Sequence, residues 1–333
     1  MRKLLLCFTF VTITLSLVTY SPTPSYSWGF FAHKLINKMA IFTLPPGMIN
    51  FYKKNLDYIS DHAVDPDKRR YGVVGEAERH YIDIDHYGKD AFKDVPKFWK
   101  AAVEKYTEDT LKAYGIVPWH IEKMVYRLQE AFKNEDLHRI LQTSAELGHY
   151  VGDAHVPLHT TENYNGQMTN QKGIHGFWES RIPEIKAQDY DYFTGRAKYT
   201  DKVLDRAWSY VKASNNAVDS VLGFERELNS RFSPDRKYSV ENRGNTNIRV
   251  YSEEYSNEYN SMLNGMVERR LRGAITQVGC LWYTAWVNAG KPDLDKLMER
   301  EISGEIKKEM QAEEQLWEKG KLENKIKGKG HDD

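Results

Sequence analysis

The chain has 333 residues, of which 41% are hydrophobic and 28% are charged. This balance excludes an intrinsically disordered protein and indicates one large or two small globular domains. The 47 basic and 47 acidic residues cancel, which disfavours a general nucleic-acid binder with a large positive excess. With 2 cysteines, the chain could form one disulfide bond at most.

Residues 1–27 have the features of a secretory signal peptide. Two basic residues open the segment, an apolar stretch of 15 residues follows from Leu4 to Val18, and a small-x-small triplet ends it. A membrane anchor is the alternative interpretation, but a span needs about 20 apolar residues. We therefore expect a secreted or periplasmic protein that begins at Trp28 after processing. Its remaining cysteine, Cys280, would then have no partner.

Apolar residues recur at helical spacing in five segments of the mature chain. These segments are residues 33–44, 118–132, 137–149, 201–232 and 255–288. Runs typical of strands are scarce outside Ile248–Tyr251, so we predict an all-α fold, a single multi-helix domain over residues 28–303. Residues 304–333 are dominated by Lys and Glu, which indicates a solvated, frayed helix or a disordered tail.

Potential metal ligands are concentrated in the segment from Glu146 to His159. His149 and Asp153 are four positions apart on a predicted helix, so both side chains lie on one face and can share a metal ion. His159 follows on the loop that leaves this helix. His155 points away from the shared face, and we expect it at the rim of the site or behind its ligands.

His175 and Glu179 are also four positions apart, like His149 and Asp153. One such pair is common on solvated helices, but two pairs within 31 residues favour a metal site. Another segment contains Asp65-Pro66-Asp67 and then His80. Its ordinary interpretation is a turn that starts a helix, followed by a structural histidine.

The predicted new N-terminus offers a different kind of ligand. Trp28 would carry a free α-amine, whose reference pKa of about 8 lets it lose its proton and bind a metal where a lysine amine seldom would. His33 follows five residues later. Coordination by the main-chain amine together with this histidine is therefore possible.

Taken in order, these motifs resemble the zinc-dependent phospholipase C and single-strand nuclease superfamily. The likeness runs from the Trp-Gly start through Pro-Asp, His-Tyr-Ile-Asp and Gly-His-x-x-Gly-Asp-x-x-x-Pro-Leu-His to His-x-x-x-Glu. The resemblance implies an all-α fold with three zinc ions in a cleft. The implied ligands are Asp67, His80, His149 and Asp153 for the first ion, His159, His175 and Glu179 for the second, and the amine and carbonyl of Trp28 with His33 and a shared Asp153 for the third.

Asp65 competes with Asp67 for the first ion, because the distance from the aspartate to the histidine varies in the family. The Pro-Asp pair favours Asp67, which would also orient the attacking water or accept its proton. The remaining histidines lack a motif and are expected to be structural or on the surface. They are His62, His86, His120, His138 and His331.

The resemblance implies hydrolysis of a phosphodiester by metal-activated water, in an exported enzyme that we expect to be a monomer. Glu179 stands where the nucleases usually carry Asp and the bacterial phospholipases carry Glu. The mature chain also cannot form the disulfides common in plant and fungal nucleases. We therefore predict a phospholipase C type enzyme that acts on phospholipid and contacts membrane surfaces transiently. A nuclease for single-stranded nucleic acid is the alternative, and a non-catalytic protein held together by closed zinc sites is disfavoured by the acidic ligands.

Overall fold

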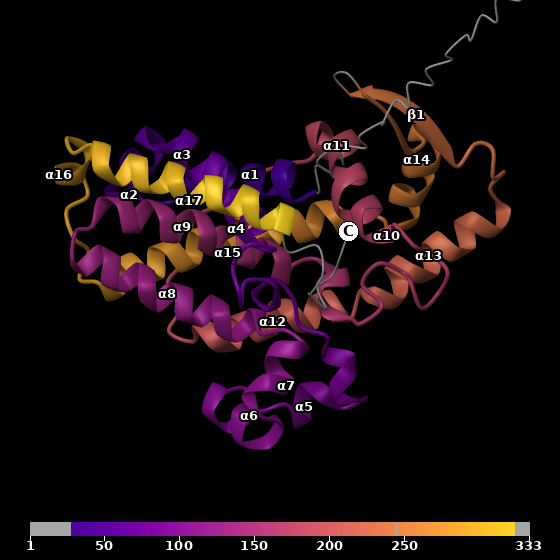
Figure 1. Ribbon diagram of the computed structural model, residues 1–333, viewed down its shortest axis with the longest axis horizontal. Helices are drawn as coiled ribbons and strands as arrows, with labels where there is room; N and C mark the ends of the chain where they lie inside the picture. Colours follow the sequence, from indigo (N-terminus) through magenta and orange to yellow (C-terminus); the bar gives the residue numbers. More distant parts are fainter. Residues whose placement is uncertain (1–27, 244–245, 324–333) are drawn as a thin grey trace, which may run out of the picture.

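The computed structural model describes residues 28–243 and 246–323, and the predicted signal peptide lies outside them. Four helices form the centre of the molecule: α1 (Trp28–Ile41), α8 (Val117–Lys133), α9 (Leu137–Ala154) and α15 (Met266–Asn288). Helix α15 packs against α1, α8 and α9, while α8 and α9 lie side by side (Figure 1). The predicted all-α fold is confirmed, since one two-stranded sheet is the only sheet among the described residues.

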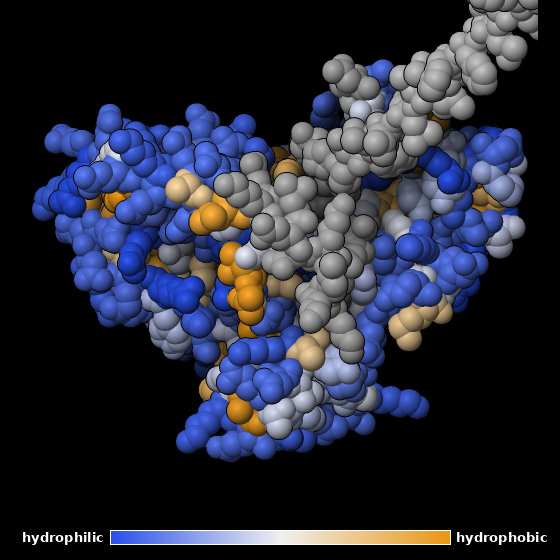
Figure 2. All heavy atoms as spheres, in the orientation of Figure 1, coloured by the Kyte–Doolittle hydropathy of each residue, from blue (hydrophilic) through white to orange (hydrophobic). Residues whose placement is uncertain are grey.

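The remaining elements surround this centre. The other helices are α2 (Pro46–Lys54), α3 (Leu56–Asp61), α4 (Asp65–Arg69), α5 (Ala91–Asp94), α6 (Trp99–Tyr106), α7 (Glu108–Ala113), α10 (Ile174–Gly176), α11 (Ile182–Lys186), α12 (Val203–Asn215), α13 (Val218–Arg231), α14 (Glu253–Met262), α16 (Asp295–Met298) and α17 (Gly304–Glu323). The shorter turns are η1 (His62–Val64), η2 (Ala77–Arg79), η3 (Ile84–Tyr87), η4 (Pro157–Thr160), the π-turn η5 (Phe177–Arg181) and η6 (Ala187–Asp189). Figure 2 shows a largely hydrophilic surface on the face drawn in Figure 1, in keeping with the high charged content.

Glycines allow α1 to lie unusually close to two other central helices. A Cβ atom on Gly148 of α9 would lie 1.8 Å from Oδ1 of Asn37. One on Gly279 of α15 would lie 1.9 Å from Oγ1 of Thr43, just after α1 ends, and 3.4 Å from the carbonyl oxygen of Ala40 in α1. Asn37 in turn donates from Nδ2 to the carbonyl oxygen of Ala145 at 2.9 Å. No larger residue fits at either glycine. The two glycines therefore allow the short distance between these helices.

The predicted segment 255–288 is wrong as a single helix. It forms α14 and α15, which are separated by Leu263–Gly265. Asn264 and Gly265 both have positive φ, at 48° and 72°. This left-handed conformation ends one helix and redirects the chain before the next. The Asn-Gly pair is a turn signal within an otherwise helical pattern.

The predicted strand-like run is confirmed and has a partner. Strand β2 (Thr246–Tyr251) pairs antiparallel with β1 (Tyr238–Arg243), with Tyr251 opposite Tyr238. The side chain of Tyr251 stacks on Phe177 at a centroid distance of 3.9 Å, which attaches the hairpin to η5. No helix among the described residues is long and apolar enough to span a membrane.

The C-terminal segment forms a helix, one of the two alternatives that its composition left open. Helix α17 covers residues 304–323, is largely exposed over residues 304–317, and packs against α4. Lys68 of α4 pairs with Glu314 at 2.8 Å, and the guanidinium of Arg69 lies over the ring of Trp317. These contacts lie outside the hydrophobic pattern, so the composition of the segment did not predict its packing against α4.

Candidate metal centre

Eight predicted ligand side chains come together at one buried place in the fold. His33 comes from α1, Asp67 from α4, His149 and Asp153 from α9, and His159 from η4. The remaining three are His80, which directly follows η2, His175 of α10 and Glu179 of η5. All except Asp67 are buried, and the Asp67 side chain keeps 18% of its surface exposed. The site therefore opens to solvent beside Asp67.

Asp153 lies at the centre of this cluster. Its Oδ2 atom is 3.0 Å from Nδ1 of His80 and 3.2 Å from Nε2 of His149. Its Oδ1 atom is 3.3 Å from Nε2 of His33 and 3.8 Å from Nε2 of His159. One carboxylate thus faces four imidazoles from four separate segments, which is the geometry expected of a residue that serves more than one cation.

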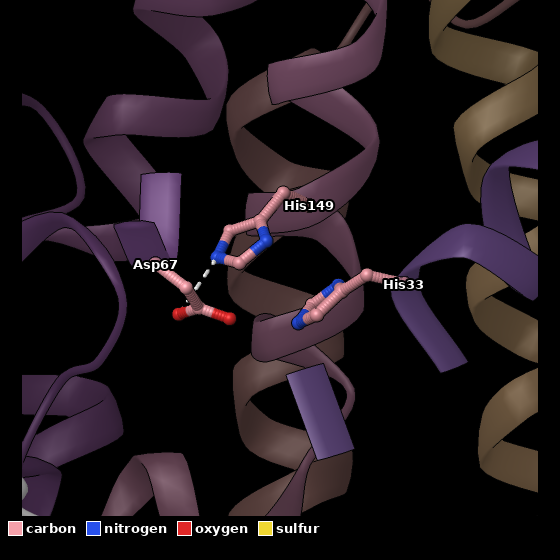
Figure 3. Close-up of side chains that lie close together, drawn as sticks. All are labelled: His33, Asp67 and His149. Carbon is pink, nitrogen blue, oxygen red and sulfur yellow. Dashed lines mark ion pairs between the residues drawn. The ribbon is translucent and has the colours of Figure 1, made fainter. Parts of the chain in front are cut away.

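Asp67, rather than Asp65, faces the histidines. The Oδ1 atom of Asp67 lies 3.6 Å from Nε2 of His149 (Figure 3). It also lies 3.7 Å from Nδ1 of His80. Asp65 is turned away and contacts His62 at 2.5 Å and Lys68 at 3.1 Å. The expected start of a helix in this segment is confirmed, since Asp65 is the first residue of α4, although its side chain does not cap the helix.

The second cluster is built on η5. Oε2 of Glu179 lies 3.1 Å from Nε2 of His175 and 3.3 Å from Nε2 of His159. The spacing of four predicted from the sequence therefore brings His175 and Glu179 together. The turn between them is a π-turn, a distortion that is frequent at functional sites because it redirects a side chain.

Hydrogen bonds to main-chain oxygens fix the orientation of three of the histidines. Nδ1 of His149 contacts the carbonyl oxygen of Ala63 at 2.9 Å, and Nδ1 of His159 contacts that of His80 at 2.8 Å. Nδ1 of His175 contacts the carbonyl oxygen of Tyr164 at 3.2 Å. A carbonyl can only accept, so each Nδ1 carries the proton and donates it. Each Nε2 is then the ring nitrogen that would offer its lone pair to a bound metal ion.

His80 is oriented the other way round. Its Nδ1 faces Asp153, and its Nε2 lies 3.7 Å from Oε1 of the buried Glu76. A carboxylate behind a ligand histidine holds the tautomer and raises the basicity of the nitrogen that faces the metal. Although burial raises the pKa of Glu76, contacts with His80 and Arg69 hold it well below its usual range.

Glu76 belongs to a buried network that the sequence analysis missed. Arg69 donates from Nε to Glu76 at 2.8 Å, from Nη1 to Glu146 at 2.6 Å and from Nη2 to the Tyr150 hydroxyl at 3.0 Å. The available signal was the spacing of four between Glu76 and His80, the same spacing that marks the two ligand pairs. The network joins α4 and α9 immediately behind the candidate ligands.

The electrostatics of the cluster suit a bound cation. Burial raises the pKa of Asp153, but His149 and His159 outweigh it and hold that pKa well below its usual range. Burial likewise opposes ionisation of Glu179, yet His175 and His159 lower its pKa to about 2. Both carboxyl groups are therefore ionised acceptors at neutral pH. Three groups of described residues have ligand atoms close enough to share an ion: His33 with Asp67 and His149, His80 with His149 and Asp153, and His159 with His175 and Glu179.

Two further residues singled out in the sequence analysis, Trp28 and His155, are not among the eight clustered side chains. Trp28 is the first residue of α1, and its coordination through the main chain stays a prediction. His155 is neither at the rim nor behind a ligand: it is buried, its Nδ1 contacts the carbonyl oxygen of Val151 at 2.7 Å, and its ring stacks on Tyr210. It is a packing residue between α9 and α12.

The sequence family agrees with the fold and with this cluster. A family model described as S1/P1 Nuclease matches residues 28–275, so the chain belongs to the S1/P1 nuclease family. This confirms the resemblance drawn from the motifs.

Comparison with solved structures finds two bacterial toxins. Alpha-toxin from Clostridium perfringens, isolated from avian strain SWCP, has 15% identity and a TM-score of 0.48, covering 80% of this chain and 66% of the toxin. Alpha toxin from Clostridium absonum has 13% identity and a TM-score of 0.47, covering 76% of this chain and 64% of the toxin. The chain thus spans about two thirds of the length of each toxin. A search of curated proteins finds no significant match.

Proposed function

We propose that this chain is an exported zinc-dependent phosphodiesterase that cleaves single-stranded nucleic acid. The observation that carries the proposal is the convergence of four histidines on Asp153 in a chain of the S1/P1 nuclease family. The donor set supports zinc, because it consists of imidazole nitrogens and carboxylate oxygens without a thiolate.

The proposed ligands divide into three sets, one for each ion. The first ion would be held by Asp67, His80, His149 and Asp153, the second by His159, His175 and Glu179, and the third by His33, Asp153 and the main chain of Trp28. The second set supplies three protein ligands, which is typical of catalytic zinc, whereas structural zinc takes four. This argues against a protein in which zinc only holds helices together.

Zinc ions in such a cluster would polarise the phosphoryl oxygen and lower the pKa of a coordinated water. Asp67 is the one side chain of the cluster with substantial exposure, so it can approach a substrate from the open side. Its carboxylate would orient the attacking water or accept its proton. The charge of Glu76, 3.7 Å from Nε2 of His80, would favour a proton on Nε2 and leave Nδ1 to face the site.

Nucleic acid is favoured as the substrate because the family match covers the whole segment that carries the ligands. Exposed aromatic side chains close to the ligands in sequence add support, since such rings stack on unpaired bases. Phe31 is 44% exposed and lies two residues before His33, and Tyr71 is 42% exposed and lies four residues after Asp67.

Phospholipid is the second candidate, and a single residue favours it. Glu179 occupies the position at which the phospholipases of the superfamily carry Glu. The buried free thiol of Cys280 also fits a mature chain without disulfides. Both substrate classes contain a phosphodiester, so the same metal cluster could act on either.

An assay of the two substrate classes separates these candidates. The processed protein, with its metal content measured, should be incubated with single-stranded DNA, RNA, and phospholipids with choline, ethanolamine or inositol headgroups. We expect cleavage of the nucleic acids, loss of activity with a chelator, and recovery with zinc. Turnover of phospholipid alone would assign the phospholipase function, and a zinc-loaded protein inactive on every substrate would contradict both.

A further inference from the structure

Helix α4, which carries Asp67, has little intrinsic stability. It contains five residues, and no side chain caps its N-terminus. Isolated helices shorter than about 12 residues are marginal in water, so a helix of this length depends on its packing for its position. The question is therefore what holds Asp67 in place over the histidines.

One set of contacts lies on the inner side of α4. Arg69 is buried and pairs with Glu76 and Glu146, the latter on α9. Glu76 also approaches His80. This network ties the C-terminal end of α4 to α9 and to a candidate ligand. The same guanidinium is the group that the C-terminal helix contacts.

The second set of contacts comes from α17. The ring of Trp317 lies 5.9 Å from the Arg69 guanidinium, within the range of a cation–π interaction. Glu314 pairs with Lys68 at 2.8 Å. Behind the ring, the Trp317 backbone packs so closely that a Cβ atom on Gly72 would lie 3.3 Å from its Cα. Figure 1 shows α17, in yellow, running across the part of the molecule that contains α4.

These contacts involve the two residues that directly follow Asp67. Lys68 is held by Glu314, Arg69 is held by Trp317, and Asp67 precedes both on the same short helix. The family match ends at residue 275, so α17 is not part of the segment that the family model covers. The position of a candidate ligand in that segment thus depends on a helix outside it.

We infer that Trp317 is a positioning residue, which acts through Arg69 to hold α4 and thereby keeps Asp67 in the metal cluster. The inference rests on the proposed metal-dependent function. On this inference, α17 contributes to activity by holding the helix that carries Asp67. Partners behind metal ligands typically change metal affinity or activity by about 10–100-fold when they are removed.

Three variants of α17 test this role. Trp317→Ala removes the ring, Trp317→Phe keeps an aromatic face over Arg69, and Leu316→Ala changes a neighbouring side chain that is 63% exposed. Zinc affinity should be measured by competition with a chromophoric chelator, and amide hydrogen exchange should be measured in the zinc-free proteins. Turnover is then measured as kcat and KM.

For Trp317→Ala we expect about tenfold weaker binding of one zinc ion and a lower kcat. We also expect faster exchange at residues 65–72 but unchanged exchange in α8 and α9. Trp317→Phe and Leu316→Ala should behave like the wild type. Wild-type zinc affinity and exchange in Trp317→Ala would overturn the inference. So would a rise in kcat/KM, because it would make α17 a cover over the site.

These measurements distinguish failure of the proposed metal-dependent function from failure of the positioning role of Trp317. If the wild-type protein binds no zinc, the metal-dependent function is wrong whatever the variants do. The exchange measurement in zinc-free protein still reports whether Trp317 holds residues 65–72. Equal exchange in all four proteins then overturns the positioning role on its own.

Discussion

Gly152 and His33 meet where α9 passes α1. A Cβ atom on Gly152 would lie 2.9 Å from two atoms of the His33 ring, closer than real Cβ atoms approach their neighbours. The His33 ring also stacks on His149 with a centroid distance of 3.9 Å. The His33 ring is thus confined between Gly152 and His149 and cannot shift away from an added side chain.

Gly152→Ala should therefore displace His33 and weaken the third metal site. We expect lower zinc content, reduced turnover and a stability loss of about 1–3 kcal/mol from overpacking. The matched control is Gly223→Ala on α13, where an added Cβ meets nothing within 4 Å. That variant should gain roughly 0.5–1 kcal/mol. Zinc analysis and urea unfolding measure both effects, and full zinc content in Gly152→Ala would contradict the packing argument.

Asp67→Asn and Asp65→Asn should have different consequences. Asp67 faces His149 and His80, so its replacement should abolish turnover while leaving the protein folded. Asp65 contacts His62 and Lys68, so its replacement should cost about 1–3 kcal/mol of stability and leave the zinc content intact. Turnover and thermal unfolding of the two variants decide the matter. The reverse pattern would transfer the catalytic role to Asp65.

Asp153→Asn should lower the zinc content by more than one ion per chain, because the carboxylate faces four histidines that belong to different proposed sites. Chelation of the wild-type protein should also lower its melting temperature, since ions that bind only the native state stabilise it by mass action. Elemental analysis and calorimetry provide the measurements. A variant with full zinc content would exclude a shared carboxylate.

Arg69→Met should be among the most destabilising single changes in the chain. It would remove the cation that pairs with Glu146 and one of the two that pair with Glu76, which keeps Arg79, at a cost of about 3–5 kcal/mol. The double variant Arg69→Met with Glu146→Gln should recover part of this loss, because it removes one of the stranded charges. Urea unfolding curves compare the single and double variants. Equal stability of Arg69→Met and wild type would show that the network is dispensable.

A chain that begins Met-Trp28 should lose the third zinc ion. An extra residue converts the Trp28 α-amine into an amide, which does not give up its proton to a metal near neutral pH. We expect the other two sites to fill, activity to fall sharply, and clean removal of the extension to restore it. Mass spectrometry of the N-terminus, a zinc count and a phosphodiester assay suffice. Equal zinc content in both forms would exclude the amine as a ligand.

The sequence predicts well which pairs of candidate ligands lie close together, because their spacing is local. His149 and Asp153, like His175 and Glu179, are one helical turn apart, and a helix fixes that geometry whatever surrounds it. The choice between Asp65 and Asp67 depends instead on how a short segment lies against two distant histidines. Glu76 and Arg69 were missed for a related reason, since their importance comes from burial and from partners on another helix.

The helices were predicted better than their limits and contacts. The break at Asn264-Gly265 lies inside a continuous apolar pattern, which outweighed the turn signal of the Asn-Gly pair; the two positive φ values show the turn. The docking of α17 could not be predicted from its composition. Its contacts depend on one tryptophan and one glutamate that meet α4 in space, and neither changes the overall hydrophilic character of the segment.

The candidate ligands extend along the chain from residue 33 to residue 179 and meet only in the folded protein. An unfolded chain offers them as isolated side chains with weak affinity for any ion. On the proposed function, metal loading would therefore follow the docking of α1 against α9. The metal that the protein carries would then depend on the ions available where folding is completed.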